Sequence, residues 1–230
     1  MVRISRLTGR FLFILTPVNN SSGGFQFSIS FIIAAVTKAG GDNNGDILYL
    51  ILNKYLKWNK SHLKCFALIM LVIILKQTCN LSSASKALPI KCLPQSFYRR
   101  MQRFFAGQYF DYRQISQLIF NMFSFDQVQL TLDRTNWKWG KRNINILMLA
   151  IVYRGIAIPI LWTLLNKRGN SDTKERIALI QRFIAIFGKD RIVNVFADRE
   201  FIGEQWFTWL IEQDINFCIR VKKTSLSPII

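Results

Sequence analysis

Two long apolar runs that almost touch in sequence constrain the fold of this chain more than any other feature. The runs "NINILMLAIVY" and "IAIPILWTLL" have only Arg154 and Gly155 between them. Apolar runs separated by such a short polar pair predict two β-strands joined by a tight hairpin. Pro159, within the second run, has no N–H to donate to a neighbouring strand, so we expect that strand at the edge of a sheet.

The segments around this hairpin predict an α/β domain. "VQLTLD" alternates, with Leu130 and Leu132 on one face, as a half-buried strand does. "NSDTKERIALIQRFIAIFG" predicts a helix that begins with a capping box of Asp172 and Glu175 and ends at Gly188. "RIVNVFAD", "GEQWFTWLIEQD" and "INFCIRVKK" then predict strand, helix and strand. Residues 126–230 are therefore expected to fold in the order βββαβαβ.

Two aspartates, Asp133 and Asp198, each end a predicted strand. Strand, helix and strand in succession favour parallel pairing through a right-handed crossover, which would bring both carboxylates to the same end of the sheet. Such a pair could hold two Mg²⁺ ions about 3.5–4 Å apart, the arrangement that clamps the attacking and leaving oxygens of a phosphodiester displacement. Two simpler roles stay open: Asp133 could open a hairpin turn, and Asp198 could be a helix N-cap.

The histidine and cysteine content excludes several other chemistries. His62 is the only histidine, which excludes the usual Ser-His-Asp and Cys-His schemes in the C-terminal half. Cys65, Cys79, Cys92 and Cys218 form no paired motif, so they indicate reduced thiols in a cytoplasmic protein and not a zinc site. The apolar run 65–75 is shorter than the roughly 20 residues that a membrane span needs, so we expect a buried helix and no membrane partner.

The charge of the chain indicates a polyanionic partner, with nucleic acid favoured. The sequence has 31 Lys and Arg against 13 Asp and Glu, a net charge of +18. Residues 52–125 hold 11 of these basic residues and a single acid, Asp111. We therefore expect a poorly ordered extension over residues 1–51, a helical DNA-binding region over 52–125, and the α/β part over 126–230.

The basic region predicts three short helices: one over roughly 61–77, one capped by Asn80 or Ser82, and one that begins after Pro94. The last helix has an apolar face and an arginine face, made respectively by Phe97, Met101 and Phe104 and by Arg99, Arg100 and Arg103. Three helices with a basic last helix are typical of a helix-turn-helix-like unit, which places that helix in the major groove of DNA. The alternative is a small helical bundle with a solvated cationic face.

The stretch "LTLDRTNWKWGKRN" places Asp133 next to a basic, aromatic turn. Trp137 could stack on unpaired bases, and Lys138, Lys141 and Arg142 could contact phosphates around it. Half-buried hairpin aromatics are the alternative for the tryptophans.

Two segments resemble a known family. "LTLDRTNWKWG" and "FADREFIGEQWF" are similar to the first and second acid-bearing motifs of DDE-class insertion-sequence transposases, in the branch with a Tyr–Arg–Glu–Lys signature around the third acid. "LSSASKALP…SFYRRMQRFF" resembles the DNA-binding region of that family. The resemblance covers roughly residues 52–223. It implies a ribonuclease H-like catalytic fold, two Mg²⁺ ions, and cutting and rejoining of the element's DNA ends, with Asp133 and Asp198 as catalytic and metal-binding residues.

The sequence departs from the family pattern at the third acid. The family carries that acid on a helix beyond the last strand, within a Tyr…Arg…Glu…Lys pattern that residues up to Ile230 do not contain. Glu200 and Glu204 are too close to Asp198 to replace it. We therefore expect an incomplete ribonuclease H-like domain and a truncated transposase that does not catalyse strand transfer alone.

The expected partner is double-stranded DNA at the element ends, and the assembly a homodimer or a mixed dimer with a full-length transposase. The alternative function is a catalytically inactive DNA-binding protein, acting as a repressor or as a dominant-negative partner of a full-length transposase. The apolar stretches at 11–18 and 25–36 leave a basic membrane-surface protein as a third class.

Overall fold

The computed structural model describes residues 44–76, 78, 80–87, 92–107, 111–139 and 142–221. The chain divides into two compact units between Leu118 and Ile119, and helix α6 (Tyr112–Met122) includes residues of both units. Most of the predicted N-terminal extension lies outside the described residues. Helix α2 (Asn44–Tyr55) nevertheless crosses the expected boundary at residue 51, so the end of that extension is helical where low order was expected.

The first unit contains the three predicted helices in addition to α2. They are α3 (Lys60–Lys76), α4 (Leu81–Ser85) and α5 (Pro94–Gly107). The side-chain oxygen of Asn80 accepts hydrogen bonds from the backbone N–H groups of Ser82 and Ser83 at 3.0 and 3.2 Å, so Asn80 is the N-cap of α4. One core joins the three helices, made by Cys65, Ile69, Val72, Ala84, Phe97, Met101 and Phe104. Among the described helices, none has both the length and the hydrophobicity to cross a membrane.

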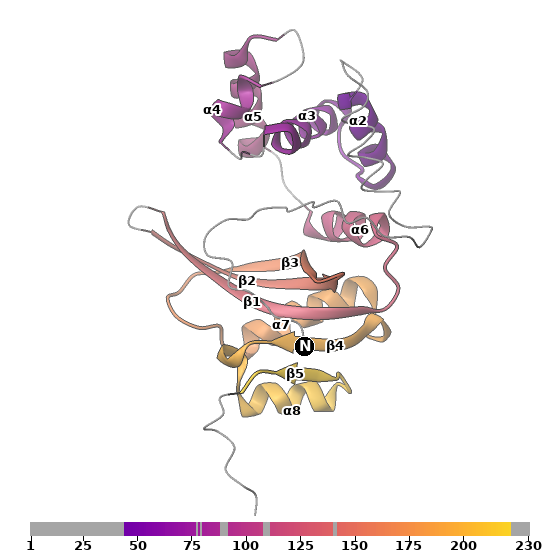
Figure 1. Cartoon of the computed structure of the whole chain (residues 1–230), viewed down its shortest axis with the longest axis vertical. Coiled ribbons are helices and arrows are strands. Elements are labelled where there is room, and N and C mark those ends of the chain that lie inside the picture. Colours follow the sequence, from indigo (N-terminus) through magenta and orange to yellow (C-terminus); the bar gives the residue numbers. More distant parts are fainter. Residues whose placement is uncertain are drawn as a thin grey trace, which may run out of the picture. The chain divides into compact units, whose positions relative to one another are not determined.

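The second unit is built on a five-stranded sheet with the order β3-β2-β1-β4-β5 (Figure 1). The strands are β1 (Val128–Trp139), β2 (Arg142–Tyr153), β3 (Ile156–Leu165), β4 (Ile192–Ala197) and β5 (Phe217–Ile219). β1, β2 and β3 pair antiparallel, while β4 pairs parallel to both β1 and β5. With helices α7 (Thr173–Phe187) and α8 (Glu204–Glu212), the order is βββαβαβ. The predicted α/β class and the predicted order of strands and helices are confirmed.

The β2–β3 hairpin has the predicted turn and the predicted edge strand. Arg154 and Gly155 have positive φ angles of 49° and 82°, the left-handed conformation that a two-residue hairpin turn requires. β3 is an edge strand, and Pro159 lies opposite Ala150 beside a shift in register. The missing N–H of Pro159 is therefore tolerated at an irregular position of the sheet margin.

Helix α7 covers the sheet face that carries the buried leucines of β1. Leu130 and Leu132 on β1 belong to the same core as Leu179 and Phe183 on α7. Asp172 and Glu175 form the predicted capping box, and Gly188, with φ 93°, ends the helix. Because α7 is fixed at both ends, it also fixes the loop that precedes it.

Replacing Asp172 by alanine is expected to lower the free energy of unfolding by about 1 kcal/mol at neutral pH, the usual effect of losing an N-cap. The backbone N–H of Glu175 and the ammonium of Lys167 lower the pKa of Asp172. A lowered folded-state pKa means that this stabilisation is present above the ordinary pKa of an aspartate and is lost as the pH falls through the lowered value. Urea unfolding at pH 7 and pH 3 would measure this, with Asp190→Ala, an exposed acid, as the control. An equal difference at both pH values would contradict the capping role.

Candidate active site and nucleic-acid interface

The two predicted acids lie at adjacent positions of neighbouring parallel strands. The parallel ladder between β1 and β4 ends at the pair Leu132 and Ala197, and Asp133 and Asp198 are the next residues on the two strands. Alternation along a strand places both on the sheet face opposite Leu132. Both aspartates are exposed. The structure thus brings together the two carboxylates that the sequence singled out.

Asp133 is not a turn residue, so that alternative is wrong. β1 continues past it as far as Trp139, and Asp133 lies opposite Met148 on β2. The sequence pattern predicted that β1 ends at Asp133, where the alternation of apolar residues stops. Pairing with β2 extends the strand well beyond that point. Asp198 does have a capping role: its side chain accepts the N–H of Arg199 at 2.7 Å and begins the short 3-10 helix η2 (Arg199–Phe201). That role uses only one oxygen of the carboxylate.

The carboxylate oxygens of the pair suit a hard divalent cation. Oδ1 of Asp133 accepts the N–H of Arg134 at 2.8 Å, as Oδ1 of Asp198 accepts that of Arg199. Within the described part of the chain, no further hydrogen bond or ion pair to either carboxylate is seen. Carboxylate oxygens are the ligands that Mg²⁺ takes in proteins, usually one or two of them together with water and substrate phosphate. No cluster of three or more His, Cys, Asp or Glu residues able to hold a metal is found among the described residues.

A polar network lies on the other side of these acids, and the sequence did not indicate it. Arg134 donates from Nη2 to Oε2 of Glu200 at 2.9 Å and from Nε to the same oxygen at 3.3 Å. Its guanidinium also donates to the side-chain oxygens of Asn145 at 3.4 Å and Asn170 at 3.1 Å. Glu200, which the sequence excluded only as a replacement for the third acid, is therefore the ion-pair partner of Arg134. The alternation of side chains along β1 could have indicated that Arg134 has an acidic partner. It places Arg134 on the same buried face as Leu130 and Leu132, where a charge needs a partner.

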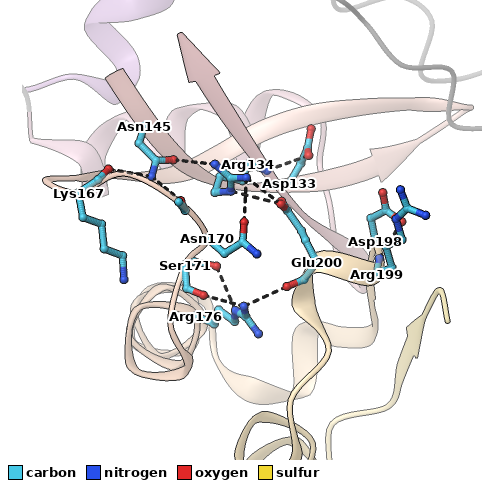
Figure 2. Close-up of polar contacts among 11 residues, drawn as sticks. Asp133, Arg134, Asn145, Lys167, Asn170, Ser171, Arg176, Asp198, Arg199 and Glu200 are labelled. Atoms are coloured by element: carbon cyan, nitrogen blue, oxygen red, sulfur yellow. Dashed lines mark hydrogen bonds and ion pairs between the residues drawn. The ribbon is translucent and has the colours of Figure 1, made fainter. Parts of the chain in front are cut away.

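Arg176 and Asn145 complete this network (Figure 2). Arg176 is buried and donates to the Ser171 hydroxyl at 3.0 Å, the Ser171 carbonyl at 2.6 Å and the Glu200 carbonyl at 3.2 Å. Burial lowers the pKa of Arg176. Asn145, 2% exposed, donates to the carbonyls of Lys167 and Gly169. The network thus joins β1, β2, the loop before α7, and η2.

The predicted arginines of α5 do not all face the same way. Arg99 and Arg103 are exposed and line a shallow hollow with Gln102 and Ala106. Arg100 is also exposed, but its guanidinium donates to the carbonyl of Ser61 on α3 at 3.4 Å. Arg99 and Arg103 therefore form the outward pair.

The basic hairpin can be placed only by its backbone. Trp137 and Lys138 lie in β1 and Arg142 in β2, but their side chains, and the whole of Lys141, lie outside the described residues. The pairing of β1 with β4 ends at Leu132, and that of β2 with β3 ends at Asn145. The last part of the β1–β2 hairpin is therefore paired only within itself and extends beyond the rest of the sheet (Figure 1).

One basic residue near the acids was not singled out from sequence. Ala197 pairs with Ile219 on β5, so Arg220 occupies the position next to Asp198, and its N–H donates to the carbonyl of Ala197 at 3.1 Å. Arg220 is exposed. Across β1, β4 and β5 the sheet therefore ends in two acids followed by a base. Only the register of the short strand β5 reveals this.

Several solved structures are similar to part of this chain. The HTLV-2 integrase catalytic core domain in complex with magnesium (dimeric form) is 14% identical with a TM-score of 0.33, over 41% of this chain and 61% of that one. The simian T-cell lymphotropic virus intasome in complex with PP2A regulatory subunit B56 gamma is 15% identical with a TM-score of 0.34, over 44% of this chain and 38% of that one. This chain thus covers less than two thirds of the length of either.

Among curated proteins, none has detectable sequence similarity to this chain. The family model described as the transposase DDE domain matches residues 124–226. That range includes both Asp133 and Asp198. Membership of the branch with the Tyr–Arg–Glu–Lys signature stays a prediction. Residues 124–226 are a transposase domain of the DDE class.

Proposed function

We propose that this protein is a transposase polypeptide that binds the DNA ends of an insertion element and uses Asp133 and Asp198 to hold Mg²⁺. The observation that carries the proposal is the register of β1 and β4, which places the two aspartates side by side after the last ladder pair. Neighbouring strands lie about 4.8 Å apart, so two carboxylates on the same face are within reach of one shared cation. When bound, magnesium would supply stabilisation of the negative charge that develops in phosphodiester displacement.

The residues around the pair favour a phosphodiester as substrate. Asp133 and Asp198 are exposed, so a DNA backbone can approach their carboxylates directly. Arg220, next to Asp198 in the sheet, can offset the negative charge of an approaching phosphate. We propose that Trp137, Lys138, Lys141 and Arg142 of the basic hairpin contact the DNA that this site binds.

We propose that residues 52–125 form the part that binds the element ends. The supporting observation is the outward pair Arg99 and Arg103 on α5, on the side away from the buried Phe97 and Met101. Arg100 would add charge from the side facing α3. Residues 126–230 would supply the acids, and residues 1–51 have no assigned role. The working assembly would be a homodimer or a mixed dimer in the cytoplasm.

The polypeptide of residues 1–230 is expected to bind DNA without completing strand transfer, because its sequence holds the first two acids of the family and no Tyr…Arg…Glu…Lys pattern. This expectation keeps a second function open, a repressor or dominant-negative partner of a full-length transposase. Incubation with cognate ends and Mg²⁺ would decide. Cleavage that disappears in Asp133→Asn would overturn the inactivity while supporting the transposase assignment.

The metal site itself is tested by titrating the full chain with Mn²⁺, a paramagnetic stand-in for Mg²⁺, and detecting free ion by electron paramagnetic resonance. Asp133→Asn and Asp198→Asn, which keep side-chain size and remove the charge, are each expected to lower Mn²⁺ affinity at least tenfold, roughly 1.4 kcal/mol. Asp190→Asn is the matched control, because Asp190 is an exposed acid in the short 3-10 helix Lys189–Arg191, and it should leave the Mn²⁺ affinity unchanged. Equal affinity in all four proteins would exclude a metal site at these two residues.

A further inference from the structure

We propose that Arg134 and Glu200 form a positioning pair that sets the spacing of Asp133 and Asp198. The inference rests on the proposed function, because it concerns the same two acids. Arg134 follows Asp133 directly, and Glu200 is the second residue after Asp198. The pair therefore connects the two acid-bearing segments immediately beyond the acids.

The end of the sheet explains why such a connection is needed. Leu132 and Ala197 are the last paired residues of β1 and β4, so the acids themselves and the residues after them form no pair of this ladder. Two carboxylates at adjacent positions repel each other, which favours their separation unless something opposes it. The Arg134–Glu200 ion pair provides a second attachment on the far side of the acids. The acids are thus bracketed by the last ladder pair and by this ion pair.

The ion pair is sheltered from solvent. The side chains of Arg134 and Glu200 are 14% and 26% exposed. An ion pair between fully exposed side chains contributes little, whereas removing one partner of a sheltered pair leaves the other charge unpaired. Within the second unit, the other Arg–carboxylate pair between the flanks of β1 and β4 is far more exposed: Arg191 and Asp126 have side chains 43% and 83% exposed.

Arginine has a specific advantage at position 134. Its fork donates to Glu200, Asn145 and Asn170 at once, so one side chain bridges η2, β2 and the loop before α7. A lysine would keep the charge but could not reproduce this planar set of bonds.

Glu200 is held by its backbone as well as by its side chain. Arg176 donates to its carbonyl, and the ring of Phe201 lies 5.1 Å from the Arg176 guanidinium. The backbone N–H of Phe201 in turn donates to the carbonyl of Asp198 at 3.0 Å. Figure 2 shows the carboxylates of Asp133 and Asp198 outside this set of side-chain contacts, so the network can position them without occupying their free oxygens.

The experiment compares Mn²⁺ affinity in the full chain for wild type, Arg134→Gln, Glu200→Gln and the double variant. Each single change is expected to lower the affinity about tenfold, the lower end of what loss of an outer-shell partner costs a metal site. If the pair acts as one device, the double variant should bind no more weakly than the weaker single variant. Arg134→Lys should lose most of the affinity despite keeping the charge. Arg191→Gln, which breaks the exposed pair at the other end of the same strands, is the control and should bind like wild type.

A second readout separates this inference from the metal assignment. In metal-free protein, the amide of Phe201 is expected to exchange hydrogen faster in Glu200→Gln than in wild type, while that of Leu149 in the sheet core stays unchanged. If wild type binds no Mn²⁺ but the Phe201 amide responds, the proposed function fails and the pair still holds the turn. Wild-type affinity in both Arg134→Lys and Glu200→Gln would overturn the positioning role. A loss that merely follows the unfolding midpoint of each variant would also overturn it, because global destabilisation would then explain it.

Discussion

Replacing Arg99 and Arg103 together by alanine is expected to weaken binding of double-stranded DNA by roughly 100-fold at 0.1 M salt. Each phosphate that a side chain neutralises releases condensed counterions and contributes about 0.9 to the slope of log affinity against log salt. At 0.1 M salt that contribution corresponds to about tenfold in affinity for each contact. The slope should therefore fall by about 1.8 in the double variant.

The double variant should fold normally, which makes the result interpretable. Arg99 and Arg103 are exposed, and their side chains leave the buried face of α5, made by Phe97, Met101 and Phe104, untouched. The one bond between them runs from the Arg103 side chain to the backbone carbonyl of Arg99, at 3.4 Å. A circular-dichroism melt should show an unchanged midpoint.

Fluorescence anisotropy of a labelled duplex between 50 and 200 mM KCl would give both the affinity and the slope. A double variant of Lys54 in α2 and Arg113 in α6, both to alanine, removes the same net charge from exposed positions elsewhere. It should keep most of the slope. If the two double variants lose slope equally, binding depends on overall charge and not on the α5 surface.

The fold was predictable from the sequence where neighbouring residues alone determine the backbone conformation. The long apolar runs, the Arg154–Gly155 turn and the edge position of Pro159 all follow from local chemistry, and the structure agrees with each. The end of β1 was not predictable in this way. Its alternation stops at Leu132, yet pairing with β2 carries the strand to Trp139. Cross-strand pairing, which no single segment contains, decides that boundary.

In the candidate site, the two acids were predictable from the sequence, but the residues that support them were not. Crossover handedness alone placed Asp133 and Asp198 at one sheet end, and the observed register puts them at adjacent positions. Glu200 could not be paired with Arg134 from sequence, because 66 positions separate them and their contact depends on the turn of η2 after the strand. Arg220 was hidden for a similar reason, since β5 is only three residues long and its register sets the neighbour of Asp198. The acids follow from strand order, whereas their support follows from packing.

Replacing Trp206 by alanine is expected to lower the free energy of unfolding by about 3–5 kcal/mol, the largest stability effect we predict. Trp206 is 0% exposed on α8 and stacks on Trp209 with ring centroids 5.7 Å apart. Its ring belongs to the core of the α/β unit, together with Phe201 of η2 and Leu130 of β1. Removing the indole leaves a cavity that this packed core can close only in part.

Trp206→Phe separates packing from hydrogen bonding at the same position. Within the described part of the chain the indole N–H of Trp206 is buried without an acceptor, which is itself unfavourable. Phenylalanine removes that donor and keeps most of the ring, so we expect it to cost less than about 1.5 kcal/mol. Urea unfolding followed by circular dichroism would measure both variants. Similar losses of stability for the alanine and phenylalanine variants would contradict this account. They would mean that Trp206 stabilises the turn bearing Asp198 and Glu200 through a specific contact of its second ring or its N–H, and not through the volume that it fills.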